Sequence, residues 1–189
     1  MINYVKIYSC GTYHPYRYRG QINPNGGDKI SKAMMDFKDP QHPNHQQAVR
    51  MFAGMLLEKV QGFSYLNKNF ITYPLEICIV PSHLENKVSL SLINIANKIC
   101  KTYPHIKYVQ SLQRYITVAS AHKENGDRSI ANHASSIKVI TNVTSKLILL
   151  IDDVKTTGGS MSACDHLLRA AGANVVLPIA LLETAVYED

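Results

Sequence analysis

The chain has 189 residues, 46% of them hydrophobic and 18% charged, which is the composition of an ordinary globular protein able to bury a substantial core. The N-terminal stretch MINYVKIYSCGTY lacks the apolar segment of a secretory signal, and no apolar run approaches the roughly 20 residues of a membrane helix, so we expect a cytoplasmic protein with no membrane partner. The net charge of +6 and the pI of about 9.1 favour an anionic partner, either a phosphorylated metabolite or a nucleic acid.

Strand-like and helix-like patterns alternate along most of the chain. Residues 1–42 are rich in tyrosine and contain the turn-forming segments YHPYRYRG and NPNGGD, so we expect them to be irregular. The hydrophobic periodicity predicts helices over 45–60, 86–101 and 160–171, and strands over 75–82, 106–112, 147–152 and 174–183. The proline at position 178 predicts that the last strand is an edge strand or carries a bulge.

This alternation predicts an α/β fold, with a mostly parallel twisted sheet and helices flanking it. We expect a single domain over 1–189, in which 43–189 form the α/β core. Ligands bind beyond the carboxyl ends of the strands in such sheets. Three segments are expected there: VPSH (80–83), a long polar stretch from Arg114 to about Ser136, and DDVKTTGGS (152–160).

The cysteines and two histidines do not suggest a metal site. The cysteines are scattered, without the paired spacing of zinc modules. Cys78, Cys100 and Cys164 lie in apolar patterns and are expected to be small buried residues. His42 and His45 of the segment HPNH have no carboxylate or cysteine close by, so we expect a surface turn that enters a helix.

The segment TTGGS that follows the aspartates has the chemistry of a phosphate-binding loop. Thr156, Thr157 and Ser160 supply hydroxyl donors, while Gly158 and Gly159 permit a tight turn with exposed amides. The helix that begins near this point adds unpaired amides and a partial positive charge. Together these groups predict an anion site sized for a phosphate.

The paired aspartates suit a different part of the same ligand. Asp152 and Asp153 would repel a phosphate, but they can accept hydrogen bonds from hydroxyls or help to hold a cation, so a five-carbon sugar phosphate satisfies both halves. Taken singly, Asp153 could simply end the strand and Ser160 could cap the helix. The order of the whole segment favours a site, and neither GxxxxGK[ST] nor GxGxxG occurs in the chain.

The segment IDDVKTTGGSM resembles the phosphoribosyl-pyrophosphate (PRPP) signature of the type I phosphoribosyltransferases. The resemblance implies that family's fold, with residues 1–42 forming a small hood over the acceptor. It implies that Asp152 and Asp153 engage the ribose 2′- and 3′-hydroxyls. It also implies a 5′-phosphate site made by Lys155, Thr156, Thr157, Gly158, Gly159 and Ser160. At Lys155 the family more often has an apolar or variable residue.

A second likeness covers most of the chain. The segments AMMDFKD, ICIVPSH, LQRY and GDRSIANHASSIKV follow one another in an order similar to the ComF-type phosphoribosyltransferases associated with DNA uptake. Within it, Arg128 and Asn132 match the family's arginine and asparagine. The family's four-cysteine zinc module is absent from this sequence, and LENKVSLSL stands in place of the Arg-Gly-Phe-Asn-Gln segment expected after VPSH.

Further candidate positions follow from the family's arrangement. Ser82 and His83 match its pyrophosphate loop, although Pro81 and Ser82 could also simply end the strand. In the polar stretch, Arg128 would contact pyrophosphate from a loop that closes over PRPP; the alternative is an exposed connector. The segment YHPYRYRG could stack on a nucleobase, bind single-stranded nucleic acid, or pack as a loop.

The predicted function is therefore an enzyme that binds PRPP with Mg²⁺ and transfers its phosphoribosyl group to a nitrogen acceptor, releasing pyrophosphate. Asp152, Asp153 and Arg128 are the predicted catalytic residues. No residue is assigned as a direct metal ligand, because Mg²⁺ is expected to arrive with PRPP. The alternative is a PRPP or nucleotide sensor, or a DNA-uptake accessory protein, without turnover. A homodimer is possible, and the sequence does not identify the acceptor.

Overall fold

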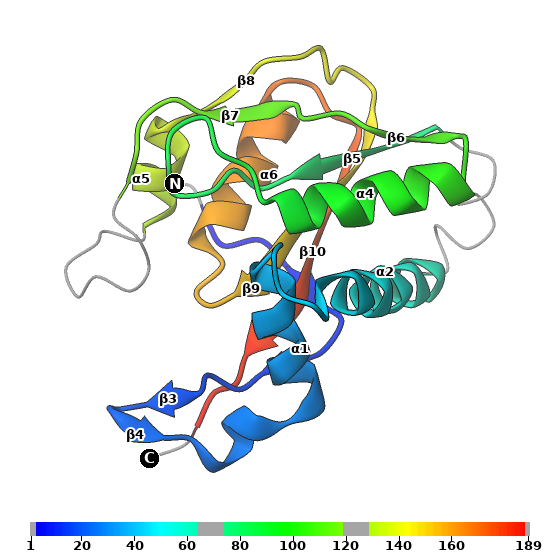
Figure 1. Cartoon of the computed structure of the whole chain (residues 1–189). Helices are drawn as coiled ribbons and strands as arrows, with labels where there is room; N and C mark the ends of the chain where they lie inside the picture. The colour runs from blue at the N-terminus through cyan, green and yellow to red at the C-terminus, as the bar shows by residue number, and fades with distance from the viewer. Residues whose placement is uncertain (1–2, 64–73, 119–128, 188–189) are drawn as a thin grey trace.

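A six-stranded parallel sheet forms the centre of the protein, whose computed structural model describes residues 3–63, 74–118 and 129–187. The strands lie in the order β1-β10-β9-β5-β6, and β2 pairs with the far end of β10 (Figure 1). Their bounds are β1 Tyr8–Ser9, β2 Thr12–Tyr13, β5 Leu75–Ile79, β6 Ile106–Tyr108, β9 Leu147–Lys155 and β10 Val175–Thr184. The predicted parallel α/β architecture is confirmed.

Helices cover both faces of this sheet, which is why its central strands are apolar almost throughout. One face carries α2 (His45–Gln61) and α4 (Leu90–Thr102), and the other carries α6 (Gly159–Ala170). Successive side chains of a strand point to opposite faces. In β9, Leu149 and Ile151 accordingly belong to the core under α2 and α4, whereas Ile148 and Leu150 belong to the core under α6.

The N-terminal part is more regular than its sequence suggests. Residues 8–13 belong to the main sheet through β1 and β2. A small hood follows, made of a hairpin of β3 (Arg17–Tyr18) and β4 (Gln21–Ile22), the short 3-10 helix η1 (Pro24–Gly27) and helix α1 (Lys29–Lys38). The expectation of an irregular segment is therefore wrong for α1, which Asp28 caps through the amides of Ile30 and Ser31.

The predicted strand over 106–112 is divided in two. β6 pairs with β5, but β7 (Leu112–Arg114) leaves the main sheet and pairs antiparallel with β8 (Ile137–Val139). The side chain of Gln110 explains the break, because its amide hydrogen-bonds to the amide and carbonyl groups of Ile79 and takes the place of a neighbouring strand there. Helix α5 (Ile130–Ser135) lies just before β8.

Strand β10 has a full neighbour on one side and only the two-residue strands β1 and β2 on the other. The carbonyl of Ala180 accepts a hydrogen bond from Cys10, so the backbone groups of Ala180 point toward β1. The nitrogen of Pro178 points the same way, toward the side that is only partly paired. The proline thus sits where no ladder hydrogen bond is lost against β9. The expectation of an edge strand is wrong, because β10 lies between β9 and the short strands β1 and β2.

Other expectations are corrected in detail. Cys78 and Cys164 are buried, whereas Cys100 is only partly buried. His45 is not a surface residue: it is 2% exposed, and its ring stacks on Phe37. Within the three described ranges, no helix is long and apolar enough to cross a bilayer.

Candidate functional site

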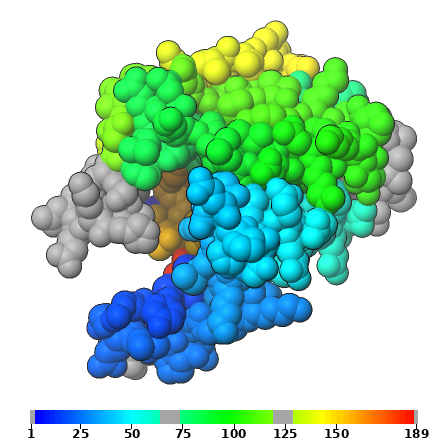
Figure 2. Space-filling view, in the orientation of Figure 1, coloured from blue at the N-terminus to red at the C-terminus, as the bar shows by residue number. Residues whose placement is uncertain are grey.

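The candidate site lies where β9 continues beyond its neighbour β5. Strand β5 ends at Ile79, which pairs with Ile151, and the amide of Val80 then donates to the carbonyl of Ile151. β9 runs on to Lys155, so the two aspartates lie inside the strand and not in the loop that was expected after residue 152. Because β5 ends earlier than β9, the side of β9 that faces β5 is open beside Asp152 and Asp153. Figure 2 shows a recess between the hood and the core, with the orange and red parts of the chain at its depth.

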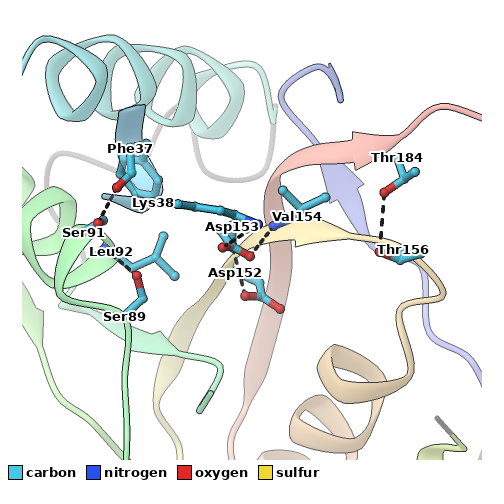
Figure 3. Close-up of polar contacts among 10 residues, drawn as sticks. All are labelled: Phe37, Lys38, Ser89, Ser91, Leu92, Asp152, Asp153, Val154, Thr156 and Thr184. Carbon is cyan, nitrogen blue, oxygen red and sulfur yellow. Dashed lines mark hydrogen bonds and ion pairs between the residues drawn. The ribbon is translucent and has the colours of Figure 1, made fainter. Parts of the chain in front are cut away.

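The two aspartates face opposite sides of the sheet. Asp153 points toward the hood, where its Oδ2 lies 3.3 Å from Nζ of Lys38 (Figure 3). Asp152 points toward the α6 face, where its charge acts on Arg114 and Cys164. Each carboxylate also accepts a backbone hydrogen bond from the next residue, at 2.9 Å for Asp152 and 2.6 Å for Asp153. One oxygen of each group is thus held by the strand, and the second is available to another partner.

The surroundings of Asp152 shift its pKa in two opposing ways. Loss of solvation, followed by the neighbouring charge of Asp153, raises the pKa of Asp152 well above the usual aspartate range. The ammonium of Lys38 acts in the opposite direction. Asp152 is partly exposed, so a cation or a hydroxyl donor can reach it.

The loop after β9 has the geometry of an anion site. Gly158 adopts φ +82°, which an ordinary residue would adopt only with strain, and it serves as the N-cap of α6. No side chain caps this helix. The alternative that Ser160 simply caps the helix does not hold, because the N-cap is Gly158 and Ser160 lies inside the first turn. The amide of Gly159 donates to Oγ1 of Thr157 at 3.4 Å, and the end of the helix still has the polarity that favours an anion. Thr156 and Thr157 are exposed beside this end of α6.

Lys155 lies beneath this loop. Its ammonium pairs with Glu183 of β10, and Ser9 donates to the other oxygen of Glu183 at 3.4 Å. The alkyl chain of Lys155 lies near Gly158, with its Cε 3.6 Å from the position of a Cβ built there. The alkyl chain of Lys155 therefore packs against the loop, while its ammonium is held by Glu183 on the β10 side.

The VPSH segment forms a second wall of the site. The amide of Ser82 donates to the carbonyl of Lys87, which folds the segment after β5 into a tight turn. His83 is exposed, and its carbonyl accepts a hydrogen bond from the amide of Val118. The base of the long polar stretch is thus attached to the VPSH turn, as expected for two segments at neighbouring strand ends. Arg128 lies outside the described residues.

Arg114 is the residue that sequence analysis missed on this side. It is 1% exposed, its Nε donates to the carbonyl of Ser82 at 2.6 Å, and its Nη1 donates to Oγ of Ser136. It thereby ties the VPSH turn to the start of β8. Burial lowers the pKa of the Arg114 guanidinium, with Asp152 among the groups that oppose this shift. Only its place in the LQRY segment of the ComF-type likeness could have drawn attention to it.

In the hairpin of the hood, an aromatic side chain packs against the C-terminal part of the same chain. Arg19 and Gly20 both have positive φ at its turn. The ring of Tyr18 lies 4.7 Å from that of Tyr187, whose hydroxyl hydrogen-bonds to His14 and Asn23 at 2.6 Å each. Loop packing thus accounts for Tyr18, one of the alternatives that the sequence left open.

Comparison with known proteins gives partial sequence matches. No protein-family model matches the sequence. The chain is 42% identical over 67 residues to an adenine phosphoribosyltransferase of Polynucleobacter asymbioticus, a match that covers 35% of this chain and 39% of that protein. A second, from Bordetella parapertussis, is 37% identical over 70 residues, or 36% of this chain and 34% of that protein. The chain therefore matches about a third to two fifths of the length of these curated relatives.

Solved structures resemble the chain more loosely. A hypoxanthine phosphoribosyltransferase from Trypanosoma cruzi has a TM-score of 0.47 at 10% identity, covering 73% of this chain and 65% of that one. A hypoxanthine phosphoribosyltransferase from Staphylococcus aureus has a TM-score of 0.43 at 15% identity, covering 75% of this chain and 68% of that one.

The fold and the site together define an α/β protein with a strand–loop–helix unit suited to an anion, flanked by two carboxylates. Over about a third of its length, the sequence of this chain is similar to adenine phosphoribosyltransferases.

Proposed function

We propose that this protein is a phosphoribosyltransferase that binds PRPP with Mg²⁺ and transfers the phosphoribosyl group to a nitrogen acceptor. The observation that carries the proposal is the continuity of β9, Gly158 and α6. Two carboxylates, each with one oxygen not bonded to the backbone, lie a few residues before α6, whose N-cap Gly158 has a left-handed conformation and no side chain to cap the first turn. PRPP likewise carries ribose hydroxyls and a 5′-phosphate close together in one small molecule.

In this proposal each part of the site has a separate task. The amides and hydroxyls of residues 156–160 hold the 5′-phosphate, with the alkyl chain of Lys155 packed against the loop. Asp152 and Asp153 accept hydrogen bonds from the ribose hydroxyls. The C1′–O bond to pyrophosphate then breaks with its electron pair on the leaving oxygen, the acceptor nitrogen forms a bond to C1′, and that nitrogen loses a proton. The protein contributes by fixing the ribose and stabilising the departing diphosphate.

The carboxylates fit a magnesium ion that is shared with the substrate. In the described part of the chain, no group of three acidic, histidine or cysteine side chains could hold a metal unaided. Mg²⁺ commonly uses one or two carboxylates together with phosphate oxygens, and Asp152 and Asp153 offer oxygens of that kind. When bound, the ion would neutralise the diphosphate.

The pyrophosphate end of the ligand is assigned to the VPSH turn. Ser82 and His83 would bind it, and Arg114 would hold Ser82 in place from behind. The role of Arg128 remains a prediction from the family resemblance. Arg128→Ala should lower turnover about 100-fold if its guanidinium contacts the leaving diphosphate, by comparison with the loss of one preorganised donor.

A purine base is the first acceptor to test, because the curated relatives are named as adenine phosphoribosyltransferases. The ComF-type affiliation is supported by the order of its segments in the sequence. The alternative is a PRPP-binding sensor without turnover. It is favoured by the turn after VPSH, where Ser82 is bonded back to Lys87 within the LENK segment and no arginine-rich stretch follows.

Pyrophosphate release tests the proposal directly. The protein would be incubated with Mg²⁺ and PRPP, first alone and then with each of a panel of purines, pyrimidines and amines. We expect release that depends on one acceptor class and is lost in Asp153→Asn. PRPP binding without release in any reaction would favour the sensor, and absence of PRPP binding would contradict both functions.

A further inference from the structure

The last residue of the hood helix reaches directly into the candidate site. Lys38 ends α1, and its ammonium lies 3.3 Å from Oδ2 of Asp153 (Figure 3). The same ammonium lies 5.9 Å from the centre of the Tyr13 ring. Lys38 therefore has two possible partners within reach, a carboxylate of the core and an aromatic face next to the hood.

The backbone that carries Lys38 is firmly placed. Phe37, the preceding residue, is fully buried and packs edge-on against Phe52 with their centroids 5.3 Å apart. The carbonyl of Phe37 accepts a hydrogen bond of 2.5 Å from Oγ of Ser91 in α4. Because these contacts fix the end of α1, a change in the position of the Lys38 ammonium requires only rotation of its own side chain.

Lys38 is paired with the oxygen of Asp153 that a ligand would have to contact. The Oδ1 atom of Asp153 accepts the hydrogen bond of the Val154 amide, and Oδ2 is paired with Lys38. A hydroxyl or a metal ion that binds the outward oxygen of Asp153 must therefore compete with this ammonium. The charge of Lys38 also acts on Asp152, but the ion pair that the structure records for Lys38 in the described residues is with Asp153.

The pair is weak enough to be exchanged. The Lys38 side chain is 47% exposed and that of Asp153 is 28% exposed. Exposed ion pairs contribute little to stability, because the charges are solvated and a long side chain must be held in one conformation. An incoming ligand that replaces the contact with two hydroxyls therefore has little to overcome, and the Tyr13 face gives the released ammonium a second position.

We propose that Lys38 is an internal cation that holds Asp153 in the ligand-free site and is displaced by the ribose hydroxyls of the substrate. The inference rests on the proposed function, since it takes the ligand to carry a ribose. It makes Lys38 a residue that sets the affinity for sugar phosphates and couples the hood to the core. A ligand without a ribose, such as inorganic phosphate, would bind residues 156–160 and leave the contact between Lys38 and Asp153 intact.

This proposal is tested by measuring affinities for ribose 5-phosphate and for inorganic phosphate by calorimetry at low salt. Lys38→Met should bind ribose 5-phosphate about 2- to 5-fold more tightly than wild type, in line with the loss of an exposed competing pair. Its affinity for inorganic phosphate should not change. Lys38→Arg should bind ribose 5-phosphate more weakly, because a guanidinium can hold a carboxylate through two hydrogen bonds.

Lys32→Met is the matched control. Lys32 lies on the same helix and its loss removes the same charge, but it makes no contact with Asp153. If Lys38 only attracts anions by its charge, both lysine variants will bind ribose 5-phosphate slightly more weakly. That result, or an unchanged affinity in Lys38→Met, overturns the inference.

The same titrations separate this inference from the proposed function. If wild type binds ribose 5-phosphate and Asp153→Asn weakens the binding, the site assignment holds whatever Lys38→Met does. If wild type does not bind ribose 5-phosphate, the proposed function and the inference both fail. Raising the ionic strength should reduce the difference between Lys38→Met and wild type, because salt screens exposed charges.

Discussion

The side chain of Ile7 lies directly against Gly158. A Cβ built on Gly158 would come within 2.7 Å of Cδ1 of Ile7, closer than real Cβ contacts allow. Such a Cβ would lie beside the anion site proposed for residues 156–160. The structure shows that it would first meet the N-terminal segment of the chain itself, in a backbone conformation of φ +82° that already disfavours it.

Gly158→Ala should therefore destabilise the protein as well as weaken phosphate binding. A left-handed conformation costs an ordinary residue about 1–2 kcal/mol, and displacement of Ile7 adds to this cost. Urea denaturation would measure the loss. Ile7→Ala introduced into Gly158→Ala removes the clash but not the backbone strain. Partial recovery of phosphate affinity in the double variant is expected, and a Gly158→Ala variant with wild-type stability would contradict the account.

The two aspartates should contribute separately to ligand binding, since they face opposite sides of β9. Asp152→Asn and Asp153→Asn should each weaken PRPP binding about 10- to 100-fold, because hydrogen bonds to a charged group are worth about 1.5–3 kcal/mol. Calorimetric titration with Mg²⁺ and PRPP provides the measurement. Circular dichroism checks that both variants are folded. Unchanged affinity in both would remove the ribose-binding role.

Arg114 should be required for the VPSH turn. Arg114→Met would leave the carbonyl of Ser82 and the hydroxyl of Ser136 without their donor, and an unsatisfied buried polar group costs about 1–3 kcal/mol. We expect a lower free energy of unfolding and weaker binding of pyrophosphate. Ser136→Ala is the control, since it keeps the bond from Arg114 to Ser82 and should retain pyrophosphate binding. Equal loss of pyrophosphate binding in both variants would argue against a specific effect on Ser82.

The raised pKa of Asp152 predicts a pH dependence of stability in the ligand-free protein. An unfolded aspartate has a pKa of about 3.9. Because the folded protein holds the proton more tightly, Asp152 contributes stability that is fully present below this value and is lost as the pH rises through its folded pKa. Asp152→Asn has no such titration. Its stability relative to wild type should increase between pH 4 and neutral pH, as measured by urea unfolding at each pH; parallel profiles would show that the shift is absent.

The strands and helices of the core were predictable because each carries its own periodic pattern. The run before Asp152 reads as a strand buried on both faces, and the helix over 45–60 shows one apolar stripe. α1 was missed because it directly follows the turn-forming segment NPNGGD, although its buried residues Met34 and Phe37 have helical spacing. The break between β6 and β7 was missed because it depends on the side chain of Gln110 bonding to a distant strand.

The site was predictable to the extent that it lies in one segment. The phosphate loop and both aspartates are contiguous in the sequence, so their chemistry could be inferred together. The roles of Lys38 and Arg114 could not be inferred in this way, because each residue contacts a partner that is distant in the sequence. Lys38 pairs with Asp153, and Arg114 donates to the carbonyl of Ser82. Nothing in the local pattern of either residue indicates that contact.

A crystal structure with Mg²⁺ and PRPP, or with ribose 5-phosphate, tests the central claim most directly. The account predicts that the 5′-phosphate lies within hydrogen-bonding distance of the amides and hydroxyls of residues 156–160, and that the ribose hydroxyls face Asp152 and Asp153. A phosphate bound elsewhere would contradict it, for instance in the groove of about 410 Å³ between α1 and α2 that Lys29 and Lys32 line.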